Sequence, residues 1–166
     1  MKRRKLAVSA IVILLLVGVA AVALAKNEGN PHSGKQGCGS YTVGESLTVG
    51  TMKGHFVNSS NHSIKGKSNG TFTFQVTQTY VTGCVISITS GTFYVGKTKY
   101  TTTGGTVLMS KGGHNGNGWG STSGGSFLVS ISALHGNSTK ASAGSARIDF
   151  KVGSSEFQIQ LGHSGH

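Results

Sequence analysis

The stretch TFTFQVTQTYVTGCVISIT (71–89) contains two runs of alternating apolar and polar side chains, separated by Thr82 and Gly83. The apolar positions are Phe72, Phe74, Val76 and Tyr80 in the first run and Cys84, Ile86 and Ile88 in the second. A period of two places every second side chain on one face of a β-strand, and helical spacing explains neither run. Two such strands joined by a short turn predict an antiparallel hairpin with one buried face.

The same alternation continues further along the chain, at residues 126–133, 147–152 and 156–161. Weaker strands are predicted at Tyr41–Val49, Lys53–Asn58, Thr92–Tyr100 and Gly105–Ser110. Short turns are expected at Ser90-Gly91 and Gly153–Ser155, and a tighter hairpin or a bulge at Gly96-Lys97. We predict an all-β fold for residues 41–162, a single antiparallel meander of about eight or nine strands closed as a barrel or a sandwich.

The N-terminus has the pattern of an export segment. Four basic residues at positions 2–5 precede Leu6–Ala25, which hold no charge, and Ala23-Leu24-Ala25 has the small-x-small form that signal peptidases accept. Residues 1–25 are therefore either a signal peptide cleaved after Ala25 or a helix retained as a membrane anchor. Both interpretations place the rest of the chain outside the cytoplasm, secreted or anchored by residues 6–25.

The charge balance favours anionic partners. Four of the fifteen basic residues and none of the four acids precede Ala25, so cleavage there lowers the formal charge from +11 to +7. Such an excess attracts acidic glycans or an envelope surface. The lysines are scattered, however, so an alternative is that they keep strand edges soluble, and we expect no specific nucleic acid partner.

Two cysteines, Cys38 and Cys84, follow the export segment. A cysteine pair in an oxidising compartment usually forms a disulfide, and no CxxC motif suggests redox chemistry. The bond would join residues 26–40, which hold no apolar run and are predicted to be a flexible linker, to a central strand.

Four sequons follow the N-x-[ST] pattern, at Asn58, Asn61, Asn69 and Asn137. Three of them crowd into residues 58–71, a turn-rich region. In an exported chain these asparagines are candidate glycosylation sites.

Residues 111–125, KGGHNGNGWGSTSGG, contain seven glycines and the only tryptophan and are predicted to be a long loop. Ordered loops of this length are often functional. Trp119 is expected either to pack against the end of the barrel or to contact a ligand such as a sugar ring. Leu128 interrupts the polar face of a neighbouring strand, so that strand is covered on both sides or touches a partner.

Histidines suggest a metal site. His163 and His166 in the tail 163–166, with His114 or His135 as a third ligand if the loops converge, could bind zinc, copper or nickel. The alternative is that the tail is a soluble end of the chain and that the protein has no cofactor.

Candidate catalytic groups are few. Asp149 and Glu156 fall on the polar face of one predicted hairpin, but Asp149 lies between Arg147 and Lys151, which favours ion pairing in solvent over glycosidase chemistry. We therefore expect a non-enzymatic protein, with a hydrolase as the least favoured alternative.

These observations give two main hypotheses. The first is an extracytoplasmic β domain with a structural, surface or adhesion role, self-associating by strand addition through residues 26–40. The second is an extracellular binding module for a transition metal or an anionic glycan, using the histidines and residues 111–125.

Overall fold

The computed structural model describes residues 38–137 and 140–162. The predicted signal or anchor segment, residues 26–37 of the predicted linker and the tail with His163 and His166 lie outside these ranges. Within the described ranges, no helix is long and apolar enough to span a membrane.

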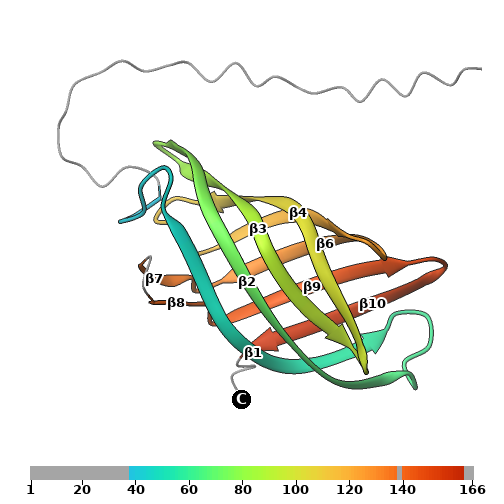
Figure 1. The fold of residues 1–166 in the computed structure, drawn as a ribbon. Coiled ribbons are helices and arrows are strands. Elements are labelled where there is room, and N and C mark those ends of the chain that lie inside the picture. The colour runs from blue at the N-terminus through green and yellow to red at the C-terminus, as the bar shows by residue number, and fades with distance from the viewer. Residues whose placement is uncertain (1–37, 138–139, 163–166) are drawn as a thin grey trace, which may run out of the picture. The chain divides into compact units, whose positions relative to one another are not determined.

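Ten strands form one sheet. They are β1 (Ser46–Asn58), β2 (Lys65–Tyr80), β3 (Gly83–Val95), β4 (Thr98–Ser110), β5 (Gly116–Thr122), β6 (Gly125–Ser132), β7 (His135–Asn137), β8 (Lys140–Ser142), β9 (Ser145–Val152) and β10 (Ser155–Gly162). Antiparallel pairing runs through β1, β2, β3, β4, β5, β6, β9 and β10, and β10 pairs back with β1. The predicted meander is therefore confirmed as a closed eight-stranded barrel rather than a sandwich (Figure 1).

On the side away from β2, strand β1 pairs with two different strands along its length. Its C-terminal half, residues 54–58, pairs with β10, whereas Val49 in its N-terminal half pairs in parallel with Ala141 of β8. A register shift between Val49 and Met52 separates the two halves. The short β7–β8 hairpin thus covers the part of β1 that β10 does not reach.

Several predicted strand boundaries were wrong. The strand predicted at Gly105–Ser110 is part of β4, which runs unbroken from Thr98. Tyr41–Val49 and Lys53–Asn58 form one continuous strand from Ser46, and Ser90-Gly91 is not a turn because β3 runs unbroken through it. At Gly91 a Cβ would lie 2.6 Å from the Phe72 ring, so the glycine makes room for that ring inside the barrel. The hairpins at 81–82, at Gly96-Lys97 and at 153–154 are confirmed.

The predicted long loop 111–125 was also wrong, because residues 116–122 form strand β5. Its inward positions are occupied by Gly116, Gly118 and Gly120, which pair with Ile131, Val129 and Phe127 of β6. A Cβ on Gly118 would lie 2.0 Å from the carbonyl oxygen of Thr106, and one on Gly120 would lie 2.3 Å from the Phe127 ring. Close approach of the neighbouring strands requires glycine here, so the strand lacks the apolar alternation by which strands are recognised.

Side chains fill the barrel interior. Phe93 is at the centre of an aromatic cluster, with its ring centroid 5.7 Å from Tyr100, 5.6 Å from Phe127 and 5.1 Å from Phe150. The gap found among the interior side chains, lined by residues such as Met52 and Phe72, has no volume open to water. The interior is therefore a packed core rather than a ligand cavity.

The predicted disulfide between Cys38 and Cys84 is confirmed, with a Cα–Cα distance of 5.2 Å. Both cysteines are buried, and the bond fixes the segment before β1 to the start of β3. Cys38, which the sequence placed in the flexible linker, is thus part of the barrel. A disulfide is typical of an oxidising compartment.

Replacing Phe93 with alanine should lower the free energy of unfolding by about 3–5 kcal/mol, because the ring leaves a cavity among three aromatic neighbours. Thr101→Ala on the exposed face of the adjacent strand is the matched control and should cost less than about 0.5 kcal/mol. Urea unfolding followed by circular dichroism measures both values. Similar losses for the two variants would contradict a packed interior.

Removing the disulfide by Cys38→Ala and Cys84→Ala together should cost up to about 4 kcal/mol, since the bond closes a loop with a sequence separation of 46 residues in the unfolded chain. Reducing the wild-type protein should cause a comparable loss. If neither treatment changes the urea midpoint, the bond does not stabilise the barrel.

Candidate functional site: an outer groove and a histidine rim

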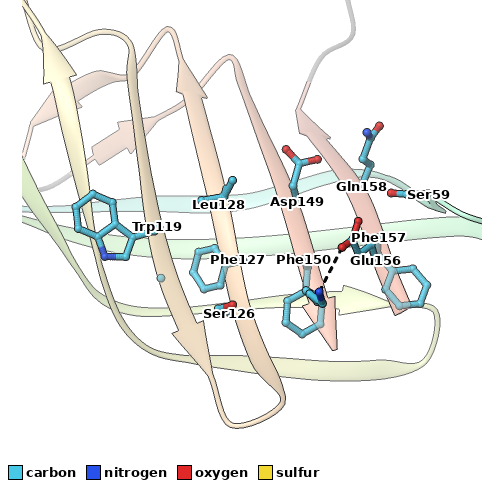
Figure 2. Close-up of a pocket in the computed structure, with 12 residues that line it drawn as sticks. Ser59, Trp119, Ser126, Phe127, Leu128, Asp149, Phe150, Glu156, Phe157 and Gln158 are labelled. Carbon is cyan, nitrogen blue, oxygen red and sulfur yellow. Dashed lines mark ion pairs between the residues drawn. The ribbon is translucent and has the colours of Figure 1, made fainter. Parts of the chain in front are cut away.

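A hollow of about 620 Å³ lies over strands β5, β6, β9 and β10. Alternate side chains on these strands point outward. The pairing register of the four strands aligns four of them in one row, each paired with the next: Trp119, Leu128, Asp149 and Gln158. Figure 2 shows these four side chains on neighbouring strands. We call this hollow the outer groove.

The apolar part of the outer groove is exposed. Trp119 is 55% and Leu128 is 61% exposed, although they are directly opposed residues on β5 and β6. Leu108 of β4, also 55% exposed, is one diagonal position from Trp119. Large apolar side chains that gather on an outer face often mark a binding surface. The expectation that Trp119 packs against the barrel end was therefore wrong.

The polar part of the outer groove carries balanced charges. Arg147 lies 3.1 Å from the Asp149 carboxylate, and Lys151 lies 3.6 Å from Glu156, the pair marked by the dashed line in Figure 2. The predicted ion pairing of Asp149 is confirmed. Both pairs are largely exposed, so each contributes at most about 1 kcal/mol to stability. Their carboxylate and ammonium groups remain accessible as hydrogen-bonding partners for a ligand.

Basic side chains continue the row beyond the groove. Gln158 pairs with Val57 of β1, and Val57 pairs with Lys65 of β2, so one register row runs from Trp119 to Lys65 across six strands. The neighbouring row contains Lys67, His55, Gln160 and Arg147 in successive pairs. A smaller hollow of about 170 Å³, lined by residues that include His55, Arg147 and Gln158, joins the two regions. The outer surface thus changes from aromatic to basic along one direction.

A separate hollow of about 440 Å³ lies at one end of the barrel, where the β4–β5 turn meets the segment after Cys38 and the start of β7. Its lining includes Tyr41, Lys111, His114 and His135. The imidazoles of His114 and His135 approach with their centroids 4.8 Å apart. We call this end the histidine rim.

Of the predicted metal ligands, His114 and His135 fall within the described part of the chain, and the structure brings these two together. Among the described residues, no group of three or more His, Cys, Asp or Glu side chains is placed to hold a metal ion. The sequence could not show that these two residues meet, because only the fold brings His135 to His114.

The sequon asparagines differ in accessibility. Asn58 is 5% exposed, and its Oδ1 accepts hydrogen bonds from the backbone amides of Ser60 and Asn61. Asn61 and Asn69 are exposed, and Asn137 lies on β7. Of the predicted glycosylation sites, Asn61 and Asn69 are thus accessible at the surface, whereas Asn58 is buried.

No family model, curated protein or solved structure matches this chain.

Tyr41 at the histidine rim should make stability depend on alkaline pH. Burial raises the pKa of its hydroxyl above the ordinary value of 10.0, and the negative charge of Glu45 raises it further. The unfolded chain therefore loses this proton first, so the stabilising contribution is complete below about pH 10 and is lost as the pH rises through the folded pKa. In urea titrations between about pH 9 and about pH 11, wild type should lose stability more steeply than Tyr41→Phe. Parallel pH curves would contradict this assignment.

Proposed function

We propose that this protein is a non-enzymatic extracytoplasmic β-barrel with a surface or adhesion role, and that it binds an anionic glycan along its outer groove. The observation that carries the proposal is the single row of exposed side chains from Trp119 through Leu128, Asp149 and Gln158 toward Lys65.

Trp119 supports a sugar ligand. A flat, exposed aromatic face offers a surface on which the apolar face of a sugar ring can stack, while neighbouring polar groups fix its orientation. Asp149 accepts hydrogen bonds and Gln158 both donates and accepts them, which suits the hydroxyl groups of a sugar. At about 4.8 Å between strands, the row is about 24 Å long over the curved sheet, enough for several sugar units.

The charge gradient supports an anionic chain rather than a neutral one. Lys65 and Lys67 lie on β2 at the far end of the same surface, and the exposed His55 of β1 and Gln160 of β10 lie between Lys67 and Arg147 of β9. The whole sequence has an excess of basic over acidic residues. Carboxylate or sulfate groups on the glycan would meet this end and make the affinity fall as salt concentration rises.

The closed barrel favours this surface over the other candidates for binding. The gap among the interior side chains has no volume open to water, and β1 and β10 pair with each other, so the barrel has no open edge between them for strand addition. Self-association through residues 26–40 stays a prediction from the sequence. The disulfide and the N-terminal export pattern support an extracytoplasmic location.

Trp119→Ala should weaken binding to dextran sulfate or polygalacturonate at least tenfold, since truncating a tryptophan that anchors a ligand typically costs about 2 kcal/mol or more. Val81→Ala is the matched control, because Val81 is 63% exposed but lies in the β2–β3 turn outside the groove. Titration calorimetry measures the affinities, and quenching of the only tryptophan in wild type reports contact with the groove directly.

A second variant tests the charged end. Lys65→Ala with Lys67→Ala should weaken binding and reduce its salt dependence, while uncharged dextran should bind wild type more weakly than either acidic polymer. Absence of binding to all three polymers, or equal affinities for wild type and Trp119→Ala, would overturn the proposal.

A further inference from the structure

We infer that His114 and His135 form a two-imidazole binding site for a divalent transition metal ion at the histidine rim. Imidazole nitrogen is a preferred ligand of copper, nickel and zinc, and affinity among these ions is highest for Cu²⁺ in the general order for nitrogen sites. This site is independent of the outer groove, because none of the residues that line the groove lines the rim.

The two rings are close enough to share one ion. Their centroids are 4.8 Å apart and their planes are inclined by 48°, so the rings are neither flatly stacked nor separated by another side chain. Both residues are exposed and line the 440 Å³ hollow, which leaves an ion and its remaining water ligands a path to the site.

The hydrogen bonding of His114 prepares it as a ligand. Its Nδ1 lies 2.9 Å from the carbonyl oxygen of Leu134. A carbonyl can only accept, so Nδ1 carries the hydrogen and donates it, which leaves the lone pair on Nε2. Metal-binding histidines almost always donate their second ring nitrogen in this way, and the bond fixes both tautomer and ring orientation.

The backbone locks the two histidines together. The amide of Leu134, the residue before His135, donates to the carbonyl oxygen of His114 at 2.8 Å. The amide of Ala133 donates to Oδ1 of Asn115 at 3.0 Å. Ala133 has a φ of 53°, a left-handed conformation that a non-glycine residue adopts only where its surroundings hold it. Segments twenty residues apart are therefore fixed to each other beside the ring pair, which lowers the cost of ordering the ligands on binding.

Lys111 also lines the rim, and its exposed, positively charged ammonium group repels a cation. Its side chain is long and can turn into solvent, so we expect it to reduce the affinity rather than abolish binding. Lys111→Ala should accordingly tighten metal binding, a result that a site elsewhere on the chain would not give.

The experiment uses the full chain without a polyhistidine tag and with His163→Ala and His166→Ala, so that the imidazoles of the tail do not contribute. Titration calorimetry with Cu²⁺ and with Ni²⁺ should give one ion per chain, and electron paramagnetic resonance of the copper form should show nitrogen coupling. Adding His135→Ala should weaken binding at least tenfold and remove the metal-dependent rise in Tm. His135→Ala leaves the bond from His114 to Leu134 in place, so the fold should be retained.

His55→Ala is the matched control, since His55 is also exposed but lies on β1 outside the rim, and it should bind metal as the parent does. Adding His114→Asn tests the second ligand and should weaken binding to a similar degree. If neither ion binds when it is present at about 100 µM in a buffer near neutral pH, the inference is overturned. Equal affinity in the parent and in the His135→Ala variant would also overturn it.

Discussion

The pairing of β1 with β10 is the constraint on which the rest of the structure depends, because it turns a meander into a barrel with an inside and an outside. Gly54 stands at this seam, where a Cβ would lie 1.8 Å from the carbonyl oxygen of Gln160. Any larger residue would push the two strands apart. Closure also protects the long strands at both ends of the meander from pairing with other chains.

In the closed barrel, side chains point alternately inward and outward along each strand, and this alternation decides where a ligand can bind. The inward positions hold rings and aliphatic side chains that pack against one another, so a ligand must use the outer face or an end. Trp119 illustrates this division, because both of its neighbours on β5 are glycines and its own side chain is forced outward beside Leu128. The exposed pair thus follows from the same register that fills the core.

The hairpin at 71–89 and the disulfide could be predicted because each depends on a local pattern or on a cysteine pair. Strand β5 could not, because glycines replace the apolar side chains that would reveal its period. The rows of paired residues across the sheet could not be predicted either, because they depend on β-bulges. One such bulge leaves Thr89 of β3 without a paired residue on β2. Single groove residues could be marked from the sequence, Trp119 as a possible ligand contact and Leu128 because it interrupts a polar face, but their position side by side could not.

The disulfide determines which parts of the surface stay free. Cys38 joins Cys84 beside the β4–β5 turn, where a Cβ on Gly113 would lie 2.7 Å from the carbonyl oxygen of Cys38. The chain therefore enters the barrel at the histidine rim, the end at which β6 and β10 finish. The groove extends toward the opposite end, where β9 ends one residue after Lys151 and β10 begins one residue before Glu156. None of the residues from Cys38 to Glu45 lines the groove, so the described part of the segment before β1 leaves the row of exposed side chains uncovered.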